Sequence, residues 1–414
     1  MSIQVKNIED VVNYQLCTGC GACAAVEPER YQIHDIEHVG RRPKIKSKVD
    51  SSGLAYQVCP GHHLQHELGE NSDSFDQELL SGWGPVLEVW EGYAADDTVR
   101  YKGSSGGAAT ALANYALSLD SVTGVLHTGK DAERPYLNKA IYSESSEELI
   151  GNAGSRYATA SPCERLAEIE KKKGQSVVIG KPCDIAAVDK LEKVSASFAS
   201  KLALKIGFFC AGVPSTKGNI ALLEKQGVEV GKLVDLKYRG EGWPGMWRAT
   251  SENSKGETQV EMTYAESWGF LQKYRQWRCY ICPDHTGEFA DLAVGDPWYR
   301  KIEEGEAGKS LIIVRSERGR KFLQQAVSAG FIVLESKESS LLPRSQPNLM
   351  KTRGNLWARL LVLKWTGSAV PVFAGFNTFK FWLDELSFKE KIQSFLGTFK
   401  RVKSKSLNKN QKHV

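Results

Sequence analysis

The sequence lacks the segments that direct proteins into or across membranes. Its first ten residues, MSIQVKNIED, contain no basic stretch followed by an apolar one, so we expect no secretory leader. The apolar stretch 356–372 is interrupted by Arg359 and Lys364 and ends at Pro371, which makes it too short for a membrane span. We therefore predict a cytoplasmic protein, and peripheral contact with the inner face of the membrane stays an open alternative.

A strong overall charge is also missing. The net charge is +5, but the segment from Lys380 onward has nine Lys/Arg and three Asp/Glu, which leaves the rest of the chain near −1. That near-neutral body has no basic patch interleaved with aromatic residues, which argues against a nucleic-acid partner. The 414 residues, 41% apolar and 25% charged, suit a globular protein of two or three domains.

Cysteine, by contrast, is plentiful, with nine residues. In a reducing compartment, closely spaced cysteines are typical of metal or cluster ligands rather than disulfides. Cys17, Cys20 and Cys23 form a C-x2-C-x2-C run, the spacing of an iron–sulfur site. Glu27 stands where a bacterial ferredoxin has its next cysteine, so Cys59, which precedes a proline, is the candidate fourth ligand. Zinc binding, and a free buried thiol at Cys59, are the alternatives.

A second set of cysteines is spread over three segments: Cys183, Cys210, Cys279 and Cys282. The first two follow β-branched runs that predict strands over 175–180 and 202–209. Carboxyl ends of strands in open α/β sheets carry the ligands, so we expect the site at this sheet edge. The remaining thiol, Cys163, is predicted to be a small buried packing residue.

A Gly/Ser loop precedes a helix expected over 108–119, and its residues are Ser104, Ser105, Gly106 and Gly107. Free N–H groups at a helix start attract anions, which suits a flavin diphosphate or ring carbonyl. The alternative is a tight turn that permits close packing. Arg156 is a candidate phosphate partner and Tyr157 a candidate ring neighbour, with structural surface roles as the alternative for both.

Three further residues complete the predicted site. Lys181 lies beside the second cysteine set and is predicted to contact the cofactor or a thiolate. Trp243, in the glycine-rich loop 238–245, is suited to cover a planar ring, or else to cover the core. Asp296 ends a strand expected over 292–295 and is predicted to orient the substrate, with a turn or cap role as the alternative. We assign Lys181 and Asp296 as the catalytic candidates.

Alternating strand and helix patterns predict an α/β fold, with a mixed sheet core flanked by helices. We further expect a polar linker over 70–82, loop or surface positions for His62, His63 and His66, and strand 331–334 after helix 317–328. At the C-terminal end, apolar residues from Phe381 to Phe399 recur at helical spacing before a basic segment. This tail could contact an anionic membrane or an acidic partner, or dock on the protein itself.

The motifs, in their order along residues 15–345, resemble the family of coenzyme F420 hydrogenase/dehydrogenase beta subunits, which includes 7-hydroxymethyl chlorophyll a reductase and bacterial polysaccharide-locus members. The motifs are the cysteine triplet, the Ser104–Gly107 loop, Gly154–Tyr157, Gly180–Asp184, Phe209–Cys210, Gly242–Gly245 and Cys279–Pro283 with Gly295–Asp296. The resemblance implies FAD and two [4Fe-4S] clusters. The first cluster would use Cys17, Cys20, Cys23 and Cys59, and the second Cys183, Cys210, Cys279 and Cys282. Ser104–Gly107, Arg156, Lys181 and Trp243 would contact the flavin.

The resemblance also implies an organisation and an activity. Residues 1–75 would form a ferredoxin-like iron–sulfur segment, 76–175 the FAD-binding domain, 176–345 the domain of the second cluster and 346–414 a basic amphipathic helical tail. Electrons from ferredoxin or a partner subunit would reach FAD and then coenzyme F420 or an organic substrate. A non-catalytic electron-transfer subunit and a membrane-docked accessory protein of polysaccharide biosynthesis are the alternatives, and a homo-oligomer stays open.

Overall fold

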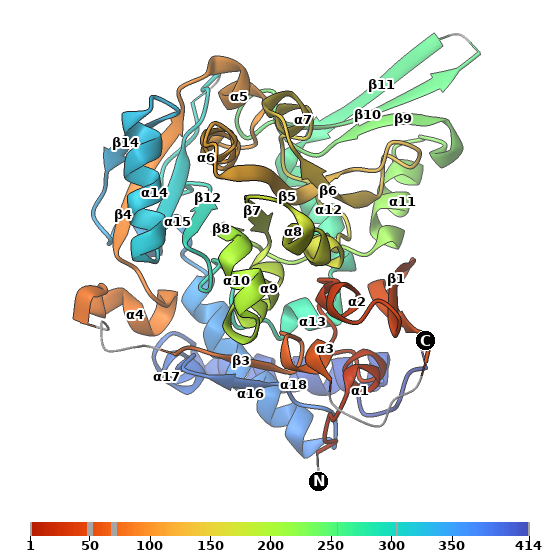
Figure 1. Cartoon of the computed structure of the whole chain (residues 1–414). Helices are drawn as coiled ribbons and strands as arrows, with labels where there is room; N and C mark the ends of the chain where they lie inside the picture. Colours follow the sequence, from red (N-terminus) through yellow and green to blue (C-terminus); the bar gives the residue numbers. More distant parts are fainter. Residues whose placement is uncertain (1, 48–52, 68–72, 255, 304, 413–414) are drawn as a thin grey trace.

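The computed structural model describes residues 2–47, 53–67, 73–254, 256–303 and 305–412 (Figure 1). Its centre is an eight-stranded mixed sheet in the order β14-β4-β13-β12-β8-β7-β5-β6, so the predicted α/β class is confirmed. The strands are β4 (Glu88–Ala94), β5 (Val122–Lys130), β6 (Asn138–Ser143), β7 (Gln175–Gly180), β8 (Leu202–Phe208), β12 (Leu292–Gly295), β13 (Ser310–Val314) and β14 (Ile332–Ser336).

The directions of the strands bring most of the motifs found in the sequence to one edge of the sheet. β5, β7, β8 and β12 are parallel neighbours, and β4 runs the same way because β13 is antiparallel to both β12 and β4. Five strands therefore end at the same edge. The segments that follow them begin at Asp131, Lys181, Phe209, Asp296 and Ala95, close to most of the motifs found in the sequence.

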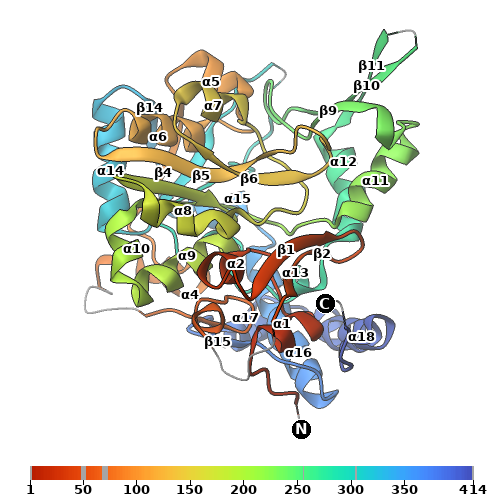
Figure 2. The ribbon, with the colours of Figure 1, turned by 45° about the vertical axis from the view of Figure 1, so that its right-hand side comes forward.

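Helices cover both faces of the sheet (Figure 2). In β7, Val177 and Ile179 pack with α6 (Ala108–Leu117) and α14 (Glu317–Ser328), whereas Val178 packs with Ile185 of α9 (Pro182–Val194) on the other face. Both faces of β7 are thus buried, which explains its continuous β-branched run. α8 (Leu166–Lys171) and α10 (Ala196–Lys201) lie on the α9 side.

Smaller elements surround this core. They are the hairpin β1 (Tyr31–Ile36) and β2 (Gly40–Ile45), the sheet of β9 (Leu233–Lys237), β10 (Met246–Asn253) and β11 (Gly256–Thr263), and the parallel pair β3 (His63–Gln65) and β15 (Val372–Ala374). The additional helices are α1 (Ile8–Asn13), α2 (Ala22–Val26), α3 (Leu54–Gln57), α4 (Gln77–Trp83), α5 (Asp97–Lys102), α7 (Ser146–Gly151), α11 (Thr216–Lys225), α12 (Tyr264–Leu271), α13 (Trp277–Tyr280), α15 (Leu341–Ser345), α16 (Leu349–Trp365), α17 (Thr378–Asp384) and α18 (Phe388–Lys405).

The two ends of the chain lie together beneath the sheet (Figure 1). Val12 of α1 and Leu16 share one apolar cluster with Leu356 and Leu363 of α16 and Val402 of α18. The tail is therefore folded onto the N-terminal segment. No helix among the described residues is long and apolar enough to cross a membrane.

The prediction of a linker is wrong, and the prediction for His66 holds only in part, because His66 lies in a loop but not at the surface. The expected linker over 70–82 contains α4, where Asp76 caps the helix by accepting N–H bonds from Glu78 and Leu79, and Trp83 is buried. Residues 70–72 of that linker lie outside the described part of the chain. His66 is not a surface histidine, because its ring lies between Phe289 and Phe376.

His66 belongs to a buried ionic network that anchors α16. Its Nε2 lies 2.7 Å from Glu288 Oε2, and Glu288 Oε1 accepts a bond from Arg353 of α16. Arg353 also donates to the Pro283 carbonyl at 3.1 Å. Although burial alone would raise the pKa of Glu288, the Arg353 guanidinium and His66 lower it to about 2. The Glu288 carboxylate is thus ionised, and Arg353 and His66 stabilise its buried charge.

We expect Arg353→Met to lower the free energy of unfolding by about 3–5 kcal/mol, because it leaves the Glu288 carboxylate buried without its guanidinium. Anaerobic urea titration followed by tryptophan fluorescence measures this loss. The double variant Arg353→Met/Glu288→Met removes both charges and should regain more than half of it. A single variant within about 0.5 kcal/mol of the wild type would contradict this role.

Candidate functional site

The first cysteine set is gathered beneath the sheet by α2 and α3. Burial, and then the neighbouring sulfurs of Cys20 and Cys17, raise the pKa of Cys59 to about 12. Burial likewise raises the pKa of Cys23 well above its usual value, with Cys20, Cys17 and Cys59 adding to the shift. The sulfur atoms are thus close enough to oppose one another's ionisation. Backbone N–H groups of Gly19 and Gly61 donate to Cys17 Sγ and Cys59 Sγ, each at 3.4 Å.

Glu27, which stands in place of the ferredoxin cysteine, holds the segment that leads to Cys59. Its Oε1 accepts from the Ala55 N–H at 3.0 Å, and its Oε2 pairs with Arg30 at 2.9 Å. Glu27 therefore fixes the start of α3, whose C-cap residue Val58 directly precedes Cys59. The sequence offered no signal for this role beyond the missing cysteine.

The second cysteine set is brought together at the carboxyl edge of the sheet, as the strand pattern indicated. Burial is the main cause that raises the pKa of Cys210 to about 12, with Cys279 next. Burial also raises the pKa of Cys282 to about 12, and Cys279 and Cys210 add to this despite the opposing charge of Arg278. Cys183, at the start of α9, is raised well above its usual pKa chiefly by burial, with Cys282 and Cys210 contributing.

The two sets are linked by direct contacts. Arg278, which precedes Cys279, donates to the carbonyls of Pro60 and Gly61, next to Cys59, at 3.2 and 3.4 Å. All nine cysteines are free of disulfides. Within the described residues, which include all nine, no three His, Cys, Asp or Glu side chains are placed to hold one metal ion.

Lys181 and Cys163 lie between the two sets. The Lys181 ammonium donates to Asp184 Oδ1 at 2.6 Å and to the Ala160 carbonyl at 3.1 Å. Burial opposes its charge, but Asp184 and the sulfurs of Cys183 and Cys163 together outweigh burial, so the pKa of Lys181 is raised. Cys163 is fully buried, as predicted, and its N–H donates to the Cys20 carbonyl at 3.1 Å. Lys181 is thus a charged group held within the protein, and its catalytic role stays a prediction.

The Ser104–Gly107 loop is packed closely against neighbouring strands. The Ser104 hydroxyl accepts a bond from the Ser155 N–H, and Gly106 N donates to Ser310 Oγ at 2.9 Å. A Cβ on Gly106 would lie 2.6 Å from the Gly92 carbonyl oxygen, so a larger residue is excluded there. Gly107 caps α6 with φ +72°, which favours glycine. The packing fits the tight-turn alternative, while anion binding stays a prediction.

Arg239, which the sequence analysis missed, ties this loop to Trp243 and Asp296. Its guanidinium binds both Asp296 oxygens, at 2.7 and 2.8 Å, and donates to the Ser104 carbonyl. Trp243 Nε1 donates to Asp296 Oδ1 at 2.9 Å, and its ring stacks on Trp298 with centroids 5.6 Å apart. The position of Arg239 within the glycine-rich loop 238–245 was the available signal.

Arg156 lies beside the turn between β5 and β6. Its Nε donates to Asn138 Oδ1 at 2.5 Å, and its other nitrogens donate to the carbonyls of Pro135 and Leu236 at 2.6 and 3.1 Å. These bonds connect the β5–β6 turn to β9. A phosphate contact for Arg156 stays a prediction, and the residue has a clear structural role.

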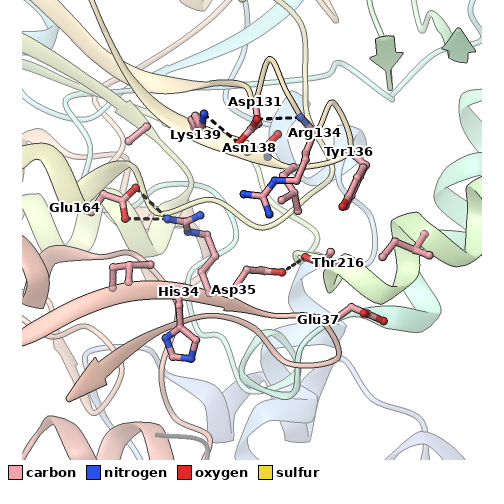
Figure 3. A pocket seen from close by; sticks show the side chains of 15 residues that line it. His34, Asp35, Glu37, Asp131, Arg134, Tyr136, Asn138, Lys139, Glu164 and Thr216 are labelled. Carbon is pink, nitrogen blue, oxygen red and sulfur yellow. Dashed lines mark hydrogen bonds and ion pairs between the residues drawn. The ribbon is translucent and has the colours of Figure 1, made fainter. Parts of the chain in front are cut away.

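A cavity of about 610 Å³ opens beside the end of β5 (Figure 3). It is lined by Ile33, His34, Asp35, Glu37, Arg41, Asp131, Arg134, Tyr136, Leu137, Asn138, Lys139, Ala140, Glu164, Thr216 and Ile220. Several of its charges are paired: Arg41 with Glu164, and Lys139 with Asp131. The Arg134 side chain points into the hollow and forms no ion pair within the described part of the chain. A cavity at this position was not predicted from the sequence.

The Glu164 wall of this cavity adjoins the first cysteine set. Arg41 donates to Glu164 and, at 3.0 Å, to Ser161 Oγ, and Ser161 in turn donates to the Gly19 carbonyl at 2.6 Å. A ligand that contacts Arg41 would therefore be connected through Ser161 to Gly19, the residue before Cys20. The arrangement combines two thiol sets and an open cavity whose lining carries charges of both signs.

Comparison with known proteins identifies the family of this chain. Sequences of the coenzyme F420 hydrogenase/dehydrogenase beta subunit match at residues 89–168 for the N-terminal part and 174–340 for the C terminus, together more than half of the chain. An F(420)H(2) dehydrogenase subunit of Methanosarcina mazei is 24% identical, over 84% of this chain and 92% of its own. Coenzyme F420 hydrogenase subunit beta of Methanococcus voltae is 25% identical, over 59% of this chain and 81% of its own.

A solved structure shares the fold. A chain of the F420-reducing [NiFe] hydrogenase complex from Methanosarcina barkeri aligns with a TM-score of 0.54 and 20% identity, covering 69% of this chain and 95% of that chain. The expected resemblance is confirmed by both domain matches. The chain belongs to the family of coenzyme F420 hydrogenase/dehydrogenase beta subunits.

Proposed function

We propose that this protein is an iron–sulfur flavoprotein oxidoreductase that holds two [4Fe-4S] clusters and FAD. The observation that carries the proposal is the gathering of eight cysteines into two sets of four, in each of which neighbouring sulfurs help to raise the pKa of a thiol. Buried thiolates need compensating positive charge, which iron supplies. A [4Fe-4S] cluster also spreads its four thiolates over four iron atoms rather than one ion.

The residues present fit such clusters. Each set offers thiolate donors alone, and backbone N–H groups are directed at the sulfurs of Cys17, Cys59 and, from Val213 at 3.4 Å, Cys279. Such bonds tune the reduction potential of a cluster. The links through Arg278 and the 160–163 segment keep the two sets adjacent. Electrons could therefore pass between them.

The flavin would lie at the sheet edge, among the Ser104–Gly107 loop, Arg156, Lys181 and Trp243. When bound, it would collect single electrons from the clusters and release them in pairs. The chain's own contribution is positioning. The Arg239–Asp296 ion pair joins the Ser104 loop to the Trp243 loop, so the two loops are held in a fixed relation.

The electron acceptor is proposed to enter the cavity beside β5. Its volume suits a small organic ligand, and the Arg134 guanidinium would attract an anionic group on that ligand. Relatives are named as subunits of F420-dependent hydrogenases and dehydrogenases, which supports coenzyme F420 as the first acceptor to test. The donor would be ferredoxin or a partner subunit. A subunit that only passes electrons onward is the second candidate, because the relatives are themselves subunits.

We expect anaerobically purified protein to contain about eight irons and one flavin per chain. Iron and acid-labile sulfide assays, together with the flavin absorbance of the released cofactor, measure this directly. The result follows from two sets of four thiolate ligands. Stoichiometric zinc without flavin would rule the proposal out.

Substitution of single cysteines separates ligands from packing residues. Cys282→Ala should reduce the iron content to about four per chain, because the second cluster loses one thiolate. Cys163→Ala is the control, since it removes a buried thiol that belongs to neither set. We expect it to retain about eight irons. Equal iron loss in the two variants would contradict the assignment.

The cavity is tested by steady-state kinetics with reduced ferredoxin as donor and coenzyme F420 as acceptor. Arg134→Gln should raise KM about tenfold with little change in kcat, because a charged hydrogen bond to a bound anion contributes about 1.5–3 kcal/mol. Arg320→Gln, on α14 away from the cavity lining, is the control and should leave KM unchanged. An unchanged KM in Arg134→Gln would place the acceptor elsewhere.

A further inference from the structure

Helix α18 presents its apolar stripe to solvent rather than to the protein. Phe388, Ile392, Leu396 and Phe399 follow one face of the helix and are 80%, 43%, 62% and 41% exposed. The face that packs on α16 carries the small or polar residues Ser394 and Thr398, with Val402, and among the large apolar residues of α18 Phe395 contacts Trp357 and Trp365 of α16. Burying those residues while exposing large apolar ones is unfavourable in water, so the stripe needs another environment.

The apolar surface extends beyond α18. Trp365, at the end of α16, is 61% exposed and stacks on Phe395 of α18. Figure 2 shows α18 on the outside of the molecule, beside α16 and away from the eight-stranded sheet. The stripe is thus a ridge on the outer surface, and we call it the α18 ridge.

Basic side chains border the ridge. By helical periodicity, exposed Lys389 and Lys400 follow its outer margin, and Lys403 lies near its C-terminal end. Within α18 the single acid is Glu390, which caps the helix and pairs with Lys351 at 2.9 Å. The exposed charge on α18 itself is therefore positive, while exposed Asp384 and Glu385 precede the helix.

We propose that the α18 ridge docks this protein on the surface of an anionic membrane. Phenylalanine and leucine on one face and lysine at its margin are the pattern of a helix that lies in the headgroup region. Lysine is depleted in protein–protein interfaces, where arginine is preferred, and five of the six basic residues of α18 are lysines. The composition thus favours lipid over an acidic protein partner.

Docking would also orient the redox site. Arg401 of α18 lies over the Tyr280 ring at 5.0 Å, and Arg359 donates to the Tyr280 carbonyl. Tyr280 lies between Cys279 and Cys282. Helix α18 therefore contacts the segment that carries Cys279 and Cys282. If the ridge docks on a membrane, the second cysteine set would lie on the side of the protein that faces the membrane.

The test is co-sedimentation of the full chain with vesicles of phosphatidylcholine, with and without 30% phosphatidylglycerol. We expect binding to the anionic vesicles that weakens in high salt. Phe388→Gln/Leu396→Gln should lower the partition coefficient at least tenfold. Each substitution removes the free energy gained when an apolar side chain moves from water into the membrane. Lys400→Gln/Lys403→Gln should lower the partition coefficient by roughly fivefold per lysine on anionic vesicles. On vesicles of phosphatidylcholine alone, this variant should bind like the wild type.

The control is Val234→Gln/Val327→Gln, which makes a similar apolar-to-polar change at two exposed valines outside α18. It should bind like the wild type, and all variants should keep wild-type iron content. Wild-type protein that stays in the supernatant with anionic vesicles would overturn the proposal. So would sedimentation velocity showing a dimer that Phe388→Gln/Leu396→Gln dissociates, because a second copy would then cover the ridge. Neither outcome depends on the cluster and flavin assignments.

Discussion

The main constraint on this structure is that it brings eight cysteines into two close sets, whose sulfurs would repel one another as thiolates. Burial and neighbouring charges raise the pKa of Cys20 to about 11 and of Cys59, Cys210 and Cys282 to about 12. Four negative charges cannot share a buried site without a positive partner. The proposed clusters supply that charge, and the surrounding contacts hold the thiols where a cluster can use them.

Those contacts come from opposite ends of the chain. Glu27 fixes the approach to Cys59, Arg278 joins the two sets, and Arg353 holds the loop after Cys282 from the C-terminal side. The C-terminal helices thus brace the redox site as well as presenting the α18 ridge. This explains why a tail that looks separable by composition shares an apolar cluster with the N-terminal segment.

Much of the fold followed from local pattern. The strands at 175–180 and 292–295 and the helix at 317–328 were predicted with their observed bounds, because apolar periodicity and end signals agreed there. The pattern failed at α4, where polar residues form a short capped helix that is stabilised by burying Trp83. β5 pairs directly with β7, so one sheet continues across residue 175, and the domain boundary expected there stays a prediction.

The sequence by itself determined the cysteine spacing, the strands that deliver Cys183 and Cys210, and the family, because each is encoded in residues close along the chain. Tertiary structure alone decided which distant groups meet. Arg239 reaches Asp296 across 57 residues, and His66 reaches Glu288 across 222. It also decided which face of α18 is buried, because an amphipathic pattern specifies a stripe but not the surface that the stripe will contact.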